Sequence, residues 1–188
     1  MNTAISAVPN DPAYDSKTIL LHWVSAALVL GLWTVGQIID FFPRGVPQIT
    51  VRSLHITFGV ALGFVLLVRL SWRRSGGRKL PAADPGTLGK VAVGVHHLLY
   101  ALLIAIVVLG IACVWIRGDS IFNLFSVPSF DPGNKVLKHN AVELHGLVAN
   151  ILLAVAAVHA VAAAWHHWQL KDDVLRRMLP RLAARAHK

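Results

Sequence analysis

The stretch that decides the fold is VELHGLVANILLAVAAVHAVAAAWHHW, from Val142 to Trp168. An apolar helix of this length can cross a hydrocarbon core of about 30 Å. The stretch carries His145 and, fourteen residues later, His159. In an α-helix, fourteen residues return to within about 40° of the same face and climb roughly 21 Å. Both imidazoles therefore lie on one side of the helix, near its opposite ends. Ionisable residues inside an apolar span are rare and usually functional.

The rest of the chain has the composition of a small integral membrane protein. Of its 188 residues, 55% are hydrophobic and only 14% are charged, which is too apolar for an ordinary soluble domain. Four stretches are long enough to span a bilayer, and they cover residues 18–41, 54–72, 91–116 and 142–168. Short connections between them predict an all-α, four-helix transmembrane bundle that forms a single domain over residues 1–188.

Basic residues are distributed unequally between the two ends of this bundle. The segment from Arg69 to Lys90, the C-terminal tail and Lys17 together hold 13 of the 18 Lys and Arg residues. The positive-inside rule places that end, with both termini, in the cytoplasm. Within the tail, residues 169–188, we predict a short surface helix from Lys171 to Met178. We expect its positive charge to bind anionic lipid at the bilayer surface rather than nucleic acid.

Two further histidines match the first two in depth. His22 lies early in the first span, toward the cytoplasm with His159, and His55 starts the second span, on the outer side with His145. Each pair comes from two helices, as bis-imidazole ligation of a planar b-type haem requires. A single zinc or copper centre would need three or four clustered ligands, and the lone Cys113 excludes a covalent CxxCH haem site. We therefore predict two b haems, with these four histidines as the axial ligands of their irons.

Several neighbours of the predicted outer ligand His55 have two possible roles. Gly59 and Gly63 follow it at intervals of one turn, and Gly146 lies in the fourth span. These glycines would let a flat macrocycle approach the backbone, or they would simply permit close helix packing. Arg52 lies three residues before His55 and shares its face, where it could pair with a haem propionate or only mark the interface.

Two histidines lie at the cytoplasmic ends of spans. His166 is about two turns beyond His159, roughly 10 Å nearer the cytoplasm. It could serve a quinone headgroup as a hydrogen-bond partner and catalytic proton relay, or it could belong to an interfacial aromatic belt. His96 opens the third span on the same side and is a further candidate for contact with a propionate or a quinone.

A series of short motifs runs along the chain. They are Leu21-His22-Trp23, Leu54-His55 with Gly59, His96 with Tyr100, Leu144-His145, His159, His166-His167, and Lys171-Asp172-Asp173 followed by Leu175 to Pro180. Together they resemble the bacterial cytochrome b561 family, and the similarity covers nearly the whole chain. The resemblance implies four helices in the bacterial inner membrane and two b haems on the same four histidines. It also implies a quinone site at His166 and, from the family's characterised type, superoxide:ubiquinone oxidoreductase activity.

We therefore predict transmembrane electron transfer from superoxide, through the outer and inner haems, to ubiquinone. One alternative is a cytochrome b subunit that links the quinone pool to another redox protein, with the outer loop from Gly118 to Lys138 as its docking surface. Another is a haem-free, histidine-lined transporter, which the lack of a polar stripe disfavours. Five basic residues face four acidic ones on the outer side, so charge counting predicts no strong positive field there. Local clustering of Arg52, Lys135 or Lys138 could still attract an anion.

Overall fold

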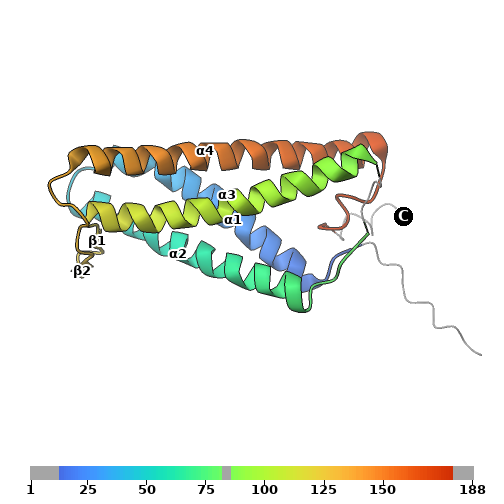
Figure 1. The fold of residues 1–188 in the computed structure, drawn as a ribbon, viewed down its shortest axis with the longest axis horizontal. Helices are drawn as coiled ribbons and strands as arrows, with labels where there is room; N and C mark the ends of the chain where they lie inside the picture. Colours follow the sequence, from blue (N-terminus) through green and yellow to red (C-terminus); the bar gives the residue numbers. More distant parts are fainter. Residues whose placement is uncertain (1–12, 82–85, 180–188) are drawn as a thin grey trace, which may run out of the picture.

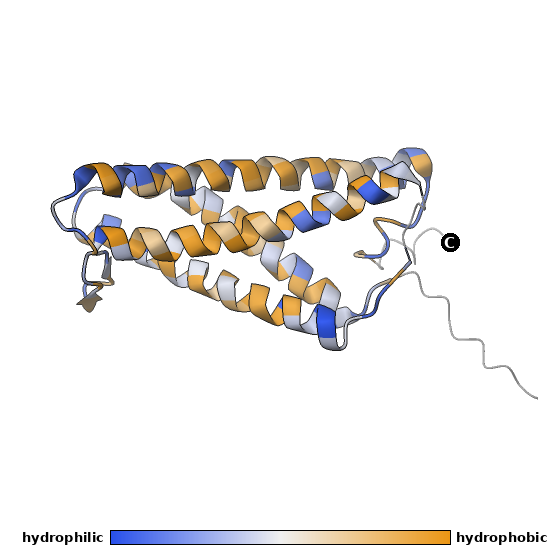
Figure 2. Ribbon diagram, viewed as in Figure 1, coloured by the Kyte–Doolittle hydropathy of each residue, from blue (hydrophilic) through white to orange (hydrophobic). Residues whose placement is uncertain are grey.

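The computed structural model describes residues 13–81 and 86–179, and within them four long helices run antiparallel to one another (Figure 1). They are α1 (Ser16–Ile38), α2 (Val46–Ser75), α3 (Thr87–Arg117) and α4 (Lys135–Trp165). All four are long and apolar enough to cross a membrane, and Figure 2 shows hydrophobic residues along most of their length. The predicted all-α, four-helix transmembrane bundle is confirmed.

Short elements complete the connections. A 3-10 turn, η1 (Ile39–Phe41), follows α1, and a π-helical turn, η2 (His166–Leu170), continues α4. After α3, the strands β1 (Ser120–Ile121) and β2 (Phe125–Ser126) pair antiparallel. Phe122 at the turn between these strands has φ 50°, a backbone conformation that bulky residues seldom adopt. The hairpin therefore depends on contacts that hold this turn in place.

All four helices begin earlier than the apolar stretches predicted, and the difference is largest for α2 and α4. α2 begins at Val46 rather than near Leu54. α4 begins at Lys135 because Asn134 caps it, with its side-chain oxygen accepting from the Leu137 amide at 2.9 Å. Hydropathy locates the part of a helix that lies in lipid, whereas its polar ends are set by caps and local hydrogen bonds.

The predicted surface helix from Lys171 to Met178 is wrong. Its first residue adopts a left-handed conformation, φ 52°, which ends η2, and turns follow. The main-chain carbonyl of Arg177 accepts from the Tyr14 amide at 3.0 Å, and that of Met178 accepts from the Trp23 indole at 3.0 Å. The segment thus folds back against the start of α1 (Figure 1). The remainder of the predicted tail lies outside the described residues.

The buried core lies midway along the bundle. It is formed by apolar side chains of α2, α3 and α4, namely Leu62, Leu66, Leu103, Ile106 and Leu152. Leu152 stands halfway between His145 and His159 along α4, so the core separates the two ends at which the predicted ligands lie. Most other large apolar side chains on the helices are exposed, as a lipid-facing surface requires.

Asp15 connects the start of α1 to the end of α2 and the segment that follows α2. Its carboxylate caps α1 by accepting from the Thr18 amide at 2.9 Å and the Thr18 hydroxyl at 2.6 Å. It also accepts from the Trp72 indole at 2.9 Å and the Arg78 amide at 3.0 Å. Burial opposes ionisation, but these hydrogen bonds outweigh it and hold the pKa of Asp15 well below its ordinary value.

Asp15→Ala is expected to lower the free energy of unfolding, because a cap alone contributes about 1 kcal/mol and a further hydrogen bond about 0.5–1.5 kcal/mol. A carboxyl with a depressed pKa stabilises above its unfolded pKa, and this stabilisation is lost as the pH falls through the folded value. The difference from wild type should therefore shrink below about pH 4. Thermal unfolding in detergent measures it, with Glu143→Gln as the control. Equal unfolding midpoints for Asp15→Ala and wild type at neutral pH would contradict this role.

Candidate haem-binding sites

The structure brings the four predicted ligands together as two pairs. The inner pair is His22 of α1 and His159 of α4, whose ring centroids are 6.5 Å apart. The outer pair is His55 of α2 and His145 of α4, whose ring centroids are 6.2 Å apart. If two imidazoles bound one iron from opposite sides, each metal–nitrogen bond would be about 2 Å long and each nitrogen would lie about 1.1 Å from the centroid of its ring. The two ring centroids would then be roughly 6.2 Å apart. Both separations therefore fit two imidazoles that share one iron.

Glycines on neighbouring helices make room for the outer pair. A Cβ atom at Gly36 of α1 would lie 3.5 Å from Cε1 of His55, and one at Gly110 of α3 would lie 3.3 Å from Cε1 of His145. Nδ1 of His145 is buried and has no hydrogen-bond partner among the described residues. A buried polar atom without a partner is costly, and a bound group that engages the imidazole would account for it.

None of the glycines predicted from the sequence has a ligand histidine of a neighbouring helix within 4 Å of its Cβ position. A Cβ atom at Gly63 would meet Cγ1 of Val107 at 3.1 Å, so Gly63 serves the packing of α2 against α3. No described atom lies within 4 Å of a Cβ position at Gly59 or Gly146, and contact of these two with a macrocycle stays a prediction. The two glycines that do contact the ligand histidines were missed, because spacing along one helix carries no information about a neighbouring helix.

The inner pair lies among polar side chains. His96 of α3 approaches His159 edge-on, with ring centroids 5.1 Å apart, so the structure places it beside the inner pair. Arg69 of α2 has Nη2 3.1 Å from Nδ1 of His22. Its guanidinium carbon also lies 5.1 Å from the centroid of the Tyr100 ring. Arg69 was not predicted from the sequence, because it stands among the basic residues near the end of α2.

His166 lies in η2, about two turns beyond His159 of the inner pair. Its Nδ1 is 2.5 Å from Oδ2 of Asp172, and the Val174 amide donates to the other oxygen of that carboxylate at 3.1 Å. Burial raises the pKa of Asp172, but these hydrogen bonds outweigh it and hold the pKa below its ordinary value. An ionised carboxylate only accepts, so Nδ1 of His166 carries a proton and Nε2 remains for another partner.

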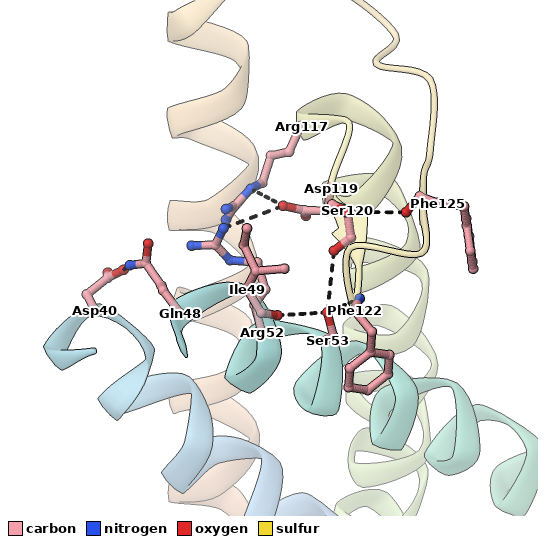
Figure 3. A network of polar contacts seen from close by, with 10 residues as sticks. All are labelled: Asp40, Gln48, Ile49, Arg52, Ser53, Arg117, Asp119, Ser120, Phe122 and Phe125. Carbon is pink, nitrogen blue, oxygen red and sulfur yellow. Dashed lines mark hydrogen bonds and ion pairs between the residues drawn. The ribbon is translucent and has the colours of Figure 1, made fainter. Parts of the chain in front are cut away.

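A polar network joins α2 to the outer loop (Figure 3). Oδ1 of Asp119 lies 3.2 Å from Nε of Arg117 and 3.8 Å from Nη1 of Arg52. Burial raises the pKa of Asp119, and these cations oppose that rise. Ser53, which is fully buried, accepts from the Phe122 amide at 2.8 Å and so holds the hairpin turn against α2. The structure places Arg52 beside Asp119, and its predicted contact with a haem propionate stays a prediction.

A cavity of about 480 Å³ opens at this end of the bundle. Its lining comes from α2, α3, α4 and the start of the outer loop, and consists of Arg52, Arg117, Asp119, Lys138, His139 and Val142. Three permanent cations surround one carboxylate, so the cavity has a net positive charge that favours anions. A count of charges over the whole outer side could not reveal this local cluster.

Comparison with known proteins gives a consistent relationship. Residues 13–181 match the family model described as prokaryotic cytochrome b561. The chain is 32% identical over 172 residues to a Yersinia pestis protein named probable superoxide oxidase CybB, covering 89% of this chain and 96% of that one. It is 32% identical over 170 residues to cytochrome b561 homolog 1 of Escherichia coli K12, with 88% and 97% covered. It is also 31% identical over 174 residues to cytochrome b562 of Cereibacter sphaeroides, with 90% and 96% covered.

These matches confirm the resemblance that the motifs indicated. The match includes all four membrane helices and both histidine pairs, so no separate domain is needed to explain it. Cytochromes b carry electrons on haem held by side chains rather than by covalent attachment, which agrees with a chain whose only cysteine is Cys113. The protein therefore belongs to the prokaryotic cytochrome b561 family, and it is a multi-pass membrane protein that binds b-type haem and transfers electrons.

Proposed function

We propose that this protein carries electrons across the bacterial inner membrane, oxidising superoxide on the periplasmic side and reducing ubiquinone on the cytoplasmic side. The supporting observation is the pair of centroid separations, 6.5 Å and 6.2 Å, at opposite ends of the bundle. Each pair holds one haem, so the chain holds two. When bound, these haems supply one-electron carriers at the two depths.

The helices have two tasks in this function. α4 supplies one ligand to each site from a single rigid element, His145 and His159, which fixes the spacing of the sites at roughly 21 Å along the helix. The apolar core around Leu152 lies between them and keeps water out of the intervening protein. A dry, fixed environment reduces the rearrangement that accompanies each change of charge.

The donor side is supported by the outer cavity. Superoxide is a small anion, and the cations of the cavity raise its local concentration and its rate of encounter. Arg52 stands one helical turn before His55, so an anion drawn to the cavity arrives near the outer pair. Asp119 keeps two of the cations in position. Superoxide gives up one electron and leaves as O₂, and this outer-sphere step needs no catalytic nucleophile.

Reversing one charge of the cavity is expected to slow the donor reaction. Lys138→Glu should lower the rate of haem reduction by superoxide about tenfold or more at low ionic strength, because steering by charge contributes 10- to 1000-fold to such rates. The salt dependence of the rate should weaken as well. Stopped-flow absorbance measures both quantities. Lys135→Glu, a matched change at the start of the same helix but outside the cavity, should have a much smaller effect. Equal rates for the two variants would argue against steering by this cavity.

A protein donor is the second candidate, in which this chain serves as a cytochrome b subunit. It is supported by exposed apolar side chains in the outer loop, Leu124 at 82%, Phe125 at 61% and Phe130 at 59% exposed, which could form a docking surface. Failure of superoxide to reduce the haems of the wild-type protein would favour this candidate over the first. Membership of a haem-binding family leaves no support for the haem-free transporter.

The acceptor side is supported by His166 and Asp172. Ubiquinone takes up two electrons and two protons to become ubiquinol, so two superoxide molecules and a source of protons are needed for each turnover. His166 is the candidate proton donor because hydrogen bonding to Asp172 fixes its tautomer. The Asp172 side chain is 35% exposed, so cytoplasmic water can return protons to this pair.

We also propose that both termini face the cytoplasm, because 13 of the 18 Lys and Arg residues lie on that side. Single cysteines can test this in a background in which Cys113 is replaced by alanine. Ser126→Cys in the outer hairpin should react with a membrane-impermeant maleimide in spheroplasts. Ser75→Cys at the end of α2 should react only after permeabilisation. The opposite labelling pattern would reverse the orientation and exchange the donor and acceptor ends.

A further inference from the structure

Arg69 is a charged residue inside the bundle, and none of the carboxylates in residues 13–81 and 86–179 pairs with it. Its guanidinium contacts His22 of α1 and lies over Tyr100 of α3, so it projects between helices. The ion pairs within the described residues involve other cations. A cation in a membrane span is costly unless an anion or a chain of acceptors compensates it. Neither a neutral imidazole nor an aromatic ring supplies a negative charge.

The contact between Arg69 and His22 cannot persist once His22 ligates a metal. A guanidinium only donates hydrogen bonds, so Nδ1 of His22 must offer it a lone pair. If Nε2 binds the iron, Nδ1 carries the imidazole proton and has no lone pair in the ring plane. If Nδ1 binds the iron, its lone pair is already used. In either case ligation forces the Arg69 guanidinium to find another acceptor close by.

We propose that this acceptor is a propionate carboxylate of the haem held by His22 and His159, an inference that rests on the proposed haem ligation. A b haem carries two carboxylates, and a guanidinium binds a carboxylate through two parallel hydrogen bonds. The Tyr100 ring adds a cation–π contact to the guanidinium, which limits how far the Arg69 side chain can move. Arg69 thus acts as an anchor for the inner haem.

Other cations at this end are less suited to the role. Arg73 and Arg74, one turn further along α2, are exposed. Lys17 lies 4.4 Å over the ring of Trp72, and Arg78 donates to the Ala13 carbonyl. Arg69 is the residue of this group that contacts a proposed ligand histidine.

The anchor has a measurable electrical consequence. A reduced haem carries one positive charge fewer than an oxidised haem, so a fixed cation beside it stabilises the reduced form. Arg69 therefore raises the midpoint potential of the inner haem. Removal of its charge should shift that midpoint to a more negative value and leave the outer haem unchanged.

The test is a redox titration of purified haem-loaded protein, followed by visible absorbance. Arg69→Gln should shift one midpoint in the negative direction, and the affected haem should be the one that His159→Ala removes. Arg69→Lys keeps the positive charge but cannot form two parallel hydrogen bonds with a carboxylate, so it should shift this midpoint less. Arg73→Gln is the matched control and should leave both midpoints unchanged. A wild-type midpoint in Arg69→Gln would overturn the proposal.

Haem with esterified propionates separates an ion pair from a general field effect. Reconstitution of the wild-type chain with haem b dimethyl ester should raise the midpoint of the inner haem, because esterification removes the negative charge of the carboxylates. Arg69→Gln should then lower that midpoint less than it does with native haem, because the esterified haem has no carboxylate to hold the guanidinium. Shifts that add in full would show that Arg69 acts on the haem without binding its carboxylate, and would overturn the proposal. If Arg69→Gln fails to hold the inner haem, Arg69→Lys supplies the same comparison. A wild-type chain without bis-histidine haems would instead refute the proposed function itself.

Discussion

His145→Ala is expected to lower the haem content of the purified protein from two per chain to one. In the structure His145 faces His55 alone among the four candidate ligands, and the inner pair lies roughly 21 Å away along the bundle. The iron of the outer haem would keep one of its two axial imidazoles, and we expect this loss of coordination to release the haem during purification. His55→Ala should give the same product. Haem assay against protein concentration measures the loss.

The complementary variants make this prediction specific. His22→Ala or His159→Ala should remove the other haem, which the reduced-minus-oxidised spectrum distinguishes from the first. His139→Ala, which changes a histidine outside both pairs, should keep both haems, and circular dichroism should show helical structure in every variant. Two bis-histidine haems retained in any variant of the four ligand candidates would overturn the pairing.

His166→Ala is expected to slow the re-oxidation of the reduced protein by a ubiquinone analogue about tenfold or more, since general acid–base groups contribute about 10²–10⁴ to such steps. Both haem spectra should be normal, because His166 lies about two turns from His159 and cannot reach the same iron. Reduction from the outer side should also be normal. Stopped-flow mixing of pre-reduced protein with the quinone measures the rate.

Neighbouring carboxylates provide a matched pair of controls for the same measurement. Asp172→Asn should slow re-oxidation, because an amide can donate as well as accept a hydrogen bond and so no longer fixes the His166 tautomer. Asp173→Asn alters the next residue, whose carboxylate pairs with Arg176 at 3.1 Å, and it should behave as wild type. Wild-type kinetics in His166→Ala would remove this histidine from the quinone site and leave it as an interfacial residue.

The fold and the histidine pairs were predictable because both follow from one-dimensional patterns. Length and hydropathy locate the four spans, and alternate crossing of the membrane fixes which end of each span lies inside. The depth of His22 or His55 is then set by its position within its span. The separation of His145 and His159 follows from helical rise alone. No knowledge of contacts between helices was needed for any of these steps.

Contacts between helices were the part that the sequence could not supply. Helices that are apolar on every side show no preferred buried face, so the rotation of each helix about its axis is not encoded in hydropathy. For this reason Gly36, Gly110 and Arg69 could not be assigned to the histidines that they contact. The outer cavity was missed for a related reason, because its cations converge from three helices. The turn segment after η2 was missed because two of its carbonyls accept from the Tyr14 amide and from the Trp23 indole of α1, contacts that no local sequence pattern encodes.

The most direct test of the account is the haem stoichiometry of the purified protein, measured by haemochrome assay together with its reduced-minus-oxidised visible spectrum. Two pairs of histidines with the observed separations predict two b haems per chain, both low-spin and both with two axial imidazoles. A single haem per chain, or a high-spin spectrum that indicates an open axial position, would contradict it.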